Sequence, residues 1–256
     1  MTWSAQQYLN FEQERTRPVR DLVAAIPKRD VRIAVDLGCG PGNSTEVLAQ
    51  RFPTASITGT DNSNDMLIAA RQRLPHMHFE LSDIATWRPT QLVDVILANA
   101  SLQWLPNHTQ LYPRLINQLA PGGCLAIQTP DNLEEPAHTL VRELAANGPW
   151  AKKTAKVQLP ARHQARDYYE LLQPHCSTLD VWRTTYFHPL AGGAAAVIEW
   201  FKGSALRPYL ELLEESEKTE FLQRYLAAVT LAYPALADGT VLLPFPRLFI
   251  VATSRS

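Results

Sequence analysis

Three glycines at alternate positions are the residues whose spacing most directly suggests chemistry in this 256-residue chain. They lie in the run Val35-Asp36-Leu37-Gly38-Cys39-Gly40-Pro41-Gly42-Asn43-Ser44. Glycine lacks a Cβ and adopts positive φ readily, so such a run lets backbone approach a ligand closely. A dinucleotide fingerprint, GxGxxG, would need a glycine where this chain has Asn43. The run therefore favours a nucleoside cofactor over a tight turn that binds nothing.

Two acidic residues follow the next strands of the chain. Asp61 comes 19 residues after Gly42, and an acid about 20 residues beyond a glycine loop accepts hydrogen bonds from ribose hydroxyls. Asp61 could instead cap a helix that begins near residues 62–63. Asp83, within Ser82-Asp83-Ile84, could meet a base edge or make an ordinary turn. Both alternatives stay open at this stage.

Strands and helices alternate from residue 31 to about residue 130. The expected strands are Ile33–Leu37, Ile57–Thr60, His78–Leu81, Val93–Ala98 and Cys124–Thr129, and the expected helices are Ser44–Arg51, one through Met66 and Leu74 ending at Pro75, and one through Leu111 and Leu119 closing at Pro121-Gly122-Gly123. This alternation predicts an α/β fold, a doubly wound parallel sheet with helices on both faces. Ligands of such sheets bind beyond the carboxyl ends of the strands, at the topological switch point.

The regular alternation of strands and helices ends after residue 130. Pro136–Asn147, Arg166–Gln173 and most of Gly193–Tyr233 have helical character, whereas Leu179–Phe187 and Leu248–Thr253 are expected strands. We therefore expect a single domain over 1–256, with N-terminal lid helices in 1–30 and a cofactor-binding core in 31–130. Helical cap insertions, 131–175 and 191–240, are expected over the ligand face, where lids commonly carry substrate specificity.

Composition excludes several classes of function. Lys+Arg number 24 against 25 Asp+Glu, so no basic excess exists for nucleic-acid binding. No apolar run reaches the roughly 20 residues of a membrane span, and the first 20 residues show no apolar signal-peptide core. Cys39, Cys124 and Cys176 form no CxxC pair, which predicts reduced thiols, a cytoplasmic location and no zinc site. His76-Met77-His78 is expected to be an exposed edge pair and not a metal site.

Five runs distributed over nearly the whole chain resemble a known family. They are Tyr8–Phe11 with Glu14–Pro18, Asp36–Thr45, Asn99–Pro106, Trp182–Tyr186 and Phe245–Ala252. The second run, with Asp61 and Asp83 after successive strands, resembles the class I S-adenosylmethionine-dependent methyltransferases, which implies a seven-stranded, mostly parallel, Rossmann-like sheet. All five together resemble the bacterial trans-aconitate 2-methyltransferase family. The resemblance implies methyl transfer from S-adenosylmethionine to a carboxylate of trans-aconitate, giving the monomethyl ester.

The resemblance also implies which residues hold the cofactor. The glycines would line the methionine moiety, Asp61 would hold the ribose, Asp83 and Ile84 would meet the adenine, and Asn99 would lie beside the methyl group. The implied cofactor-binding residues are Asp36, Gly38, Gly40, Gly42, Asn43, Asp61, Asn62, Asp83, Ile84 and Asn99.

The chemistry of a carboxylate methylation fits this residue set. A carboxylate with a pKa of about 4 is already ionised at neutral pH, so no acid or base catalyst is expected, and orientation by Asn99, Gln103 and Trp104 would suffice. A small tricarboxylate needs cationic partners in a closed site, and arginine, with 18 residues against six lysines, matches carboxylate geometry. The candidate substrate-binding residues are Tyr8, Arg15, Arg17, Trp104, Arg183, Tyr186, Arg207 and Arg247. Each arginine could instead be a solvated side chain that covers apolar surface.

A constraint follows for the arginines. A guanidinium on the attacking oxygen would lower its nucleophilicity, so the arginines should hold the carboxylates that do not react. Three other functions stay open: methylation of another small carboxylic acid or a malonyl-carrier, a nicotinamide oxidoreductase, whose fingerprint Asn43 breaks, and a binding module without catalysis. The chain is expected to act as a monomer or weak homodimer.

Overall fold

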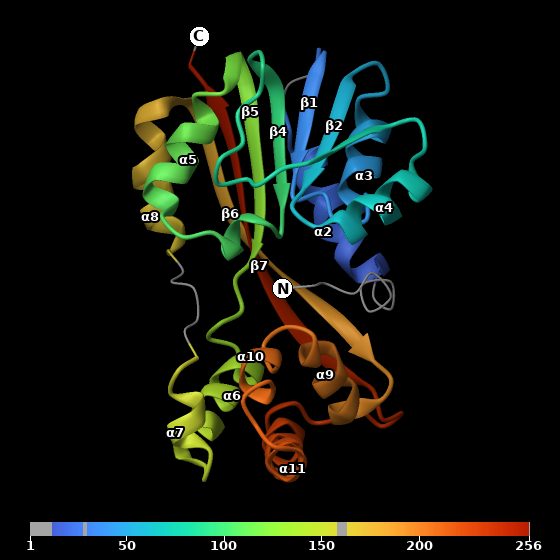
Figure 1. Cartoon of the computed structure of the whole chain (residues 1–256), viewed down its shortest axis with the longest axis vertical. Coiled ribbons are helices and arrows are strands. Elements are labelled where there is room, and N and C mark those ends of the chain that lie inside the picture. The colour runs from blue at the N-terminus through green and yellow to red at the C-terminus, as the bar shows by residue number, and fades with distance from the viewer. Residues whose placement is uncertain (1–11, 28–29, 158–162, 256) are drawn as a thin grey trace. The chain divides into compact units, whose positions relative to one another are not determined.

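The computed structural model describes residues 12–27, 30–157 and 163–255, and the side chains of residues 12–15 are outside this description. The chain divides into two compact units (Figure 1). The first unit comprises residues 1–130, 160–184 and 247–256, and the second comprises 131–159 and 185–246. Within the part that the structure describes, no helix combines the length and the apolar character needed to cross a bilayer.

A seven-stranded sheet organises the chain, with the strand order β3-β2-β1-β4-β5-β7-β6 (Figure 1). The strands are β1 (Ile33–Leu37), β2 (Ser56–Asp61), β3 (His78–Leu81), β4 (Val93–Asn99), β5 (Leu119–Pro130), β6 (Cys176–Leu190) and β7 (Val241–Ser254). β3, β2, β1, β4 and β5 pair in parallel, and β7 pairs with β5 in the antiparallel sense. The order reverses at β1, where β2 lies on one side and β4 on the other. This sheet confirms the predicted doubly wound, mostly parallel fold.

Helices connect these strands. They are α2 (Glu12–Ala24), α3 (Asn43–Arg51), α4 (Asn64–Arg73), η1 (Leu102–Trp104), α5 (His108–Ile116), α6 (Pro136–Asn147), α7 (Ala151–Thr154), α8 (Ala165–Leu172), η2 (Gln173–His175), α9 (Gly193–Lys202), α10 (Arg207–Leu210) and α11 (Glu215–Ala232). The short α7 was not expected from the sequence, because four residues are too few to show a period.

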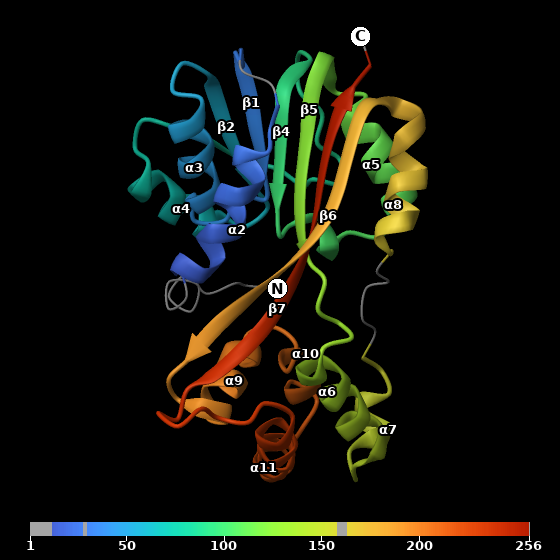
Figure 2. The same cartoon turned by 180° about the vertical axis from the view of Figure 1, so that it is seen from behind.

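The two faces of the sheet differ because side chains alternate along each strand. One face carries a hydrophobic cluster that includes Ala98 and Ile127, and residues of α5 and α8 pack on it. Asn99 and Gln128 are the next residues along β4 and β5, so they belong to the opposite face. On that side α2 packs against α3 and β5 (Figure 2). Asn99 and Gln128 therefore share a face that the main apolar cluster does not use.

The predicted helix through Leu119 was wrong at its end. α5 ends at Ile116, and Leu119 already pairs with Val93 as the start of β5. The amide N–H of residue 117 and that of residue 118 close a tight turn on the carbonyls of Pro113 and Leu115. The Pro-Gly-Gly run therefore lies inside an irregular strand, where Gly122 has a φ of +68°.

The last strand also begins earlier than expected. β7 starts at Val241 and includes Pro244 and Pro246, which the sequence placed before it. The Pro246 carbonyl accepts a hydrogen bond from the Asp131 amide at 2.9 Å. Proline removes a donor but keeps its acceptor, so an irregular stretch of strand tolerates both prolines.

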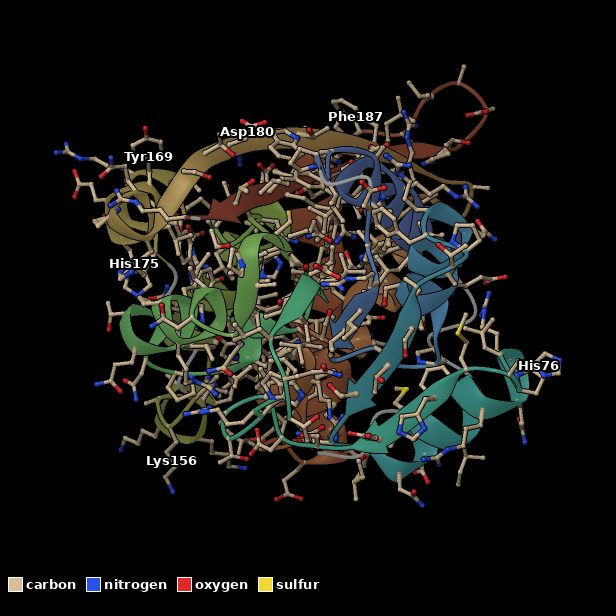
Figure 3. The ribbon with its side chains drawn as sticks, turned by 90° about the horizontal axis from the view of Figure 1, so that it is seen from above. His76, Lys156, Tyr169, His175, Asp180 and Phe187 are labelled. Atoms are coloured by element: carbon tan, nitrogen blue, oxygen red, sulfur yellow. The ribbon has the colours of Figure 1, made fainter. Side chains whose placement is uncertain are left out.

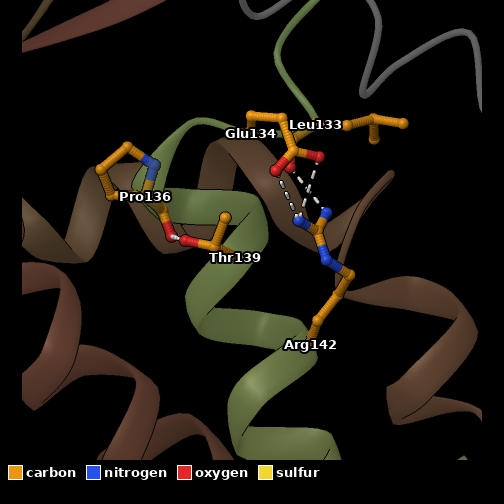
Figure 4. Close-up of polar contacts among 5 residues, drawn as sticks. All are labelled: Leu133, Glu134, Pro136, Thr139 and Arg142. Atoms are coloured by element: carbon orange, nitrogen blue, oxygen red, sulfur yellow. Dashed lines mark hydrogen bonds and ion pairs between the residues drawn. The ribbon is translucent and has the colours of Figure 1, made fainter. Parts of the chain in front are cut away.

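The second unit has a core of its own. Trp150 is fully buried, with its ring 5.0 Å from that of Phe221. The Tyr225 hydroxyl donates to the Ala137 carbonyl at 2.8 Å, so α11 and α6 are joined by a buried hydrogen bond. The Arg142 guanidinium, from the middle of α6, donates to the carbonyl of Leu133 in the segment before this helix at 2.6 Å (Figure 4).

Residues 163–175 group with the sheet-bearing unit. Tyr168 and Leu172 on α8 explain this grouping, because both belong to the apolar cluster of the sheet. Tyr169, on the other side of the same helix, points outward and is 48% exposed (Figure 3).

Candidate active site

The glycine run forms a turn between β1 and α3. Gly38, Gly40 and Gly42 have φ values of +75°, +53° and +90°. The Gly38 amide donates to the Thr60 carbonyl at 2.8 Å, so the turn is held against the end of β2. A Cβ on Gly38 would lie 2.4 Å from the Cβ of Ser101, whereas a Cβ on Gly40 would meet no atom of the described residues within 4 Å. Packing therefore requires glycine at position 38, and the residues that the structure describes leave open space at position 40.

Asp61, at the end of β2, supports this turn directly. Its Oδ2 accepts a hydrogen bond from the Gly40 amide at 3.0 Å, and its Oδ1 accepts one from the Ser63 amide at 2.9 Å. Burial raises the pKa of Asp61, and these backbone donors oppose the rise. Ser63, and not Asp61, is the N-cap of α4. Asn62 between them is exposed.

Asp36 lies beneath the turn, completely buried on β1. Its Oδ2 accepts hydrogen bonds from the hydroxyls of Ser44 and Thr45, both at 2.7 Å. Burial raises the pKa of Asp36 to about 6, even though these two hydroxyls lower it. Ser44 and Thr45 are the second and third residues of α3, so Asp36 ties the strand to the helix across the turn. Asn43 is the first residue of that helix.

The two predicted residues that follow β3, Asp83 and Ile84, lie in different environments. Asp83 is exposed, and its Oδ1 accepts from the Ala85 amide at 2.8 Å, which is ordinary turn chemistry. Ile84 is buried, and its Cδ1 would lie 3.4 Å from a Cβ on Gly38. Ile84 therefore adjoins the glycine turn.

A second turn follows β4 and meets the first one. Asn99 ends the strand, and its Oδ1 is buried without a hydrogen-bond partner among the described residues. The Ser101 hydroxyl donates to the Leu37 carbonyl at 2.7 Å, which joins this turn to the end of β1. Gln103 donates from Nε2 to the Ala100 carbonyl at 2.7 Å, so the orientation of its amide is fixed. Trp104 is 48% exposed.

His108 holds the turn that carries Gln103 and Trp104. Its Nε2 lies 2.9 Å from the Leu102 carbonyl and its Nδ1 lies 2.7 Å from the Tyr168 hydroxyl. Since a carbonyl can only accept, Nε2 carries a proton. Neither Ser101 nor His108 was singled out from the sequence, because an isolated serine or histidine in a loop has no distinctive pattern.

The predicted cationic residues lie in different environments. Arg247 is only 4% exposed and donates from Nη1 to Gln128 Oε1 at 3.0 Å. Arg17 and Arg183 are exposed. Arg207 forms an ion pair with Glu211 at 2.6 Å. Arg207 and the buried Tyr186 belong to the second unit, and Tyr8 and the side chain of Arg15 lie outside the described residues.

Gln128 is a further polar residue that the sequence analysis did not single out. It is completely buried near the carboxyl end of β5, where it is the register partner of Asn99 on β4. A glutamine inside the apolar run Leu125–Thr129 is the pattern that could have identified it, since a buried polar group needs a partner.

Metal-ligating residues do not cluster in the described part of the chain. His76 points outward (Figure 3), and His78 Nε2 lies 2.7 Å from Glu80 Oε1 at the exposed edge strand β3.

The turn fits the nucleoside cofactor that the resemblance implies. Open space at Gly40, the half-buried Asp61 carboxylate and the buried Asn99 Oδ1 adjoin one edge of the sheet. This edge is formed by the carboxyl ends of β1, β2 and β4, beside the point where the strand order reverses, where such sheets bind ligands.

Comparison with known proteins agrees with this geometry. Residues 34–123, which hold the glycine turn, match the family model of a methyltransferase domain. The trans-aconitate 2-methyltransferase of Yersinia pestis (strain Pestoides F) is 52% identical over 98% of this chain and 97% of its own length. The chain belongs to the trans-aconitate 2-methyltransferase family. The family member from Variovorax paradoxus (strain S110) is 50% identical, with both chains covered completely.

A solved structure supports the fold of this trans-aconitate 2-methyltransferase family member. The plantazolicin methyltransferase BpumL, in complex with SAH, has a TM-score of 0.53 and 16% identity over 98% of this chain and 90% of its own. At that identity the likeness concerns the fold alone.

Proposed function

We propose that this chain transfers a methyl group from S-adenosylmethionine to one carboxylate of trans-aconitate, giving the monomethyl ester. The observation that carries the proposal is the open glycine turn at the carboxyl end of β1, in a chain related over its full length to this family. S-adenosylmethionine supplies a methyl group that its sulfonium already activates, so the protein has to bind and orient the two reactants.

The cofactor assignment follows the environments of the residues. Gly38, Gly40, Gly42 and Asn43, above Asp36, are proposed to line the methionine moiety. Each carboxylate oxygen of Asp61 accepts a hydrogen bond from a backbone N–H. The remaining lone pairs of these oxygens can accept hydrogen bonds from ribose hydroxyls. Asn62, Asp83 and the apolar Ile84 are proposed to meet the adenine, and Asn99 the reactive end of the cofactor.

The substrate assignment rests on charge. Burying a trianion requires cationic partners, and Arg247 is buried, whereas Arg17 and Arg183, also candidates within the described residues, are exposed. Arg183 and Arg17 are proposed to join it, with Trp104 and Gln103 orienting the reacting carboxylate. The sequence resemblance alone supports the assignment of four further residues to the substrate, namely Tyr8, Arg15, Tyr186 and Arg207. No general base is needed, because the attacking carboxylate is ionised at neutral pH.

A cytoplasmic location and a monomeric or weakly dimeric state are part of the proposal. The three cysteines are free and buried, which suits a reducing compartment.

Mass analysis of the product tests the function. The purified chain is incubated with methyl-labelled S-adenosylmethionine and either trans-aconitate or citrate, and we expect a labelled monomethyl ester from trans-aconitate and far less from citrate. Cofactor binding without any ester would favour a binding module. Transfer only to another small acid or to a malonyl-carrier would retain the methyltransferase and overturn the substrate.

A further inference from the structure

Gln128 carries a buried amide near the carboxyl end of the internal strand β5, and the proposed function does not yet use it. Its Oε1 accepts a hydrogen bond from Arg247 Nη1 at 3.0 Å. Because a guanidinium can only donate, the oxygen of the amide must face Arg247. The nitrogen, with its two N–H donors, is therefore directed elsewhere.

That nitrogen has no hydrogen-bond partner among the described residues, and it is buried. A buried donor without an acceptor is costly, so native proteins seldom retain one that no ligand, water or side chain satisfies. The Oδ1 of Asn99, the register partner of Gln128 on β4, is buried without a described partner as well. Two such atoms on neighbouring strands indicate that a polar ligand completes this part of the site.

Arg247 and Gln128 lie on the same face of the sheet. Gln128 pairs in register with Phe249 on β7, and Arg247 precedes Phe249 by two residues. Since side chains two apart on a strand share a face, Arg247, Gln128 and Asn99 all project from the face opposite the main apolar cluster. Gln128 is neutral, so it orients the Arg247 guanidinium without cancelling its charge.

We propose that Gln128 is a specificity-determining residue that forms, with Arg247, the subsite for a carboxylate that does not react. Oε1 of Gln128 holds the guanidinium, and Nε2 donates to the carboxylate that Arg247 binds. This inference rests on the proposed function. It also satisfies the constraint that the guanidinium should hold a carboxylate other than the attacking one.

Two isosteric substitutions separate this role from simple support of Arg247. Gln128→Glu keeps an acceptor for Arg247 but replaces the donor with a negative charge that repels a carboxylate. Gln128→Met removes both interactions. If Gln128 donates to the substrate, the KM for trans-aconitate should rise at least tenfold in Gln128→Met and more in Gln128→Glu. If Gln128 only positions Arg247, Gln128→Glu should be the milder variant, and that order would overturn the proposal.

Controls distinguish the loss of a substrate contact from the loss of cofactor binding or of folding. In both variants the dissociation constant of S-adenosylhomocysteine should stay near the wild-type value, and the unfolding midpoint should stay above the assay temperature. Thr253→Val serves as the matched control, because Thr253 also carries a buried hydroxyl without a described partner but pairs with Cys124, four residues before Gln128 on β5. Its KM should not change. Fumarate has one carboxylate fewer than trans-aconitate. The KM for fumarate should therefore differ less between the wild type and Gln128→Met than the KM for trans-aconitate does.

Two further outcomes are decisive. If the wild-type chain does not methylate trans-aconitate, the proposed function fails; if it does and the KM of the Gln128 variants is unchanged, only this inference fails. Should Gln128→Glu not fold, Gln128→Met is combined with Arg247→Lys. Strictly multiplicative effects of the two changes on KM would then overturn the shared subsite.

Discussion

The glycine at position 40 gives the sharpest test of the cofactor site. With a φ of +53°, an alanine there would adopt the left-handed conformation, which costs about 1–2 kcal/mol. No further cost is expected without cofactor, because a Cβ would meet no atom within 4 Å in the described part of the chain. If the open space receives the cofactor, the same methyl group should raise the dissociation constant of S-adenosylhomocysteine at least tenfold, about 1.4 kcal/mol.

Gly122 provides a matched control for this substitution. Its φ is +68° and a Cβ there would also meet no described atom within 4 Å, but it lies near the start of β5. Gly40→Ala and Gly122→Ala should therefore lower the free energy of unfolding by similar amounts in urea titrations. Calorimetric titration with S-adenosylhomocysteine should then distinguish them. Equal affinities in the two variants would refute the assignment of the glycine turn to the cofactor.

Three other perturbations have expected outcomes. Gly38→Ala should destabilise the chain by about 2–5 kcal/mol through its φ of +75° and a 2.4 Å approach to Ser101 Cβ, and Ser101→Gly should recover part of the urea midpoint. Burial raises the pKa of Asp36 from 3.8 to about 6, so the folded chain retains a proton there that the unfolded chain loses. The free energy of unfolding should consequently fall by about 3 kcal/mol as the pH rises from about 4 to about 7. Asp36→Asn should remove this contribution in denaturation curves recorded across that range, and an unchanged slope would contradict the raised pKa. His108→Phe removes both ring hydrogen bonds and should cost about 2–3 kcal/mol, measured as a lower thermal midpoint; a wild-type midpoint would show that these bonds contribute little.

Local sequence patterns predicted the sheet well because its buried strands are short apolar runs that end in polar residues. β1 and β3 match their predicted bounds, and Asp36, the glycines and Asp61 lie together as their spacing suggested. Each of these features is encoded within about ten residues, where local geometry dominates.

The features that were missed depend on contacts between distant segments. Leu119 continues the helical period of α5, but pairing with Val93 makes it part of a strand. Gln128 and Arg247 are 119 residues apart, and their hydrogen bond exists only because β7 returns beside β5. No spacing within one segment encodes that partnership, although a glutamine in an apolar strand marks the position.

Cys39 occupies the centre of the glycine turn, and its thiol has a practical consequence. The sulfur is buried with 3% of the residue exposed, and burial, with the carboxylates of Asp36 and Asp61 nearby, raises the pKa of this thiol. Alkylating reagents attack the thiolate, so Cys39 is protected as long as the turn keeps its shape. Its labelling rate is thus a native reporter of how often the backbone around Gly38 and Gly40 opens, readable by mass spectrometry without an added probe.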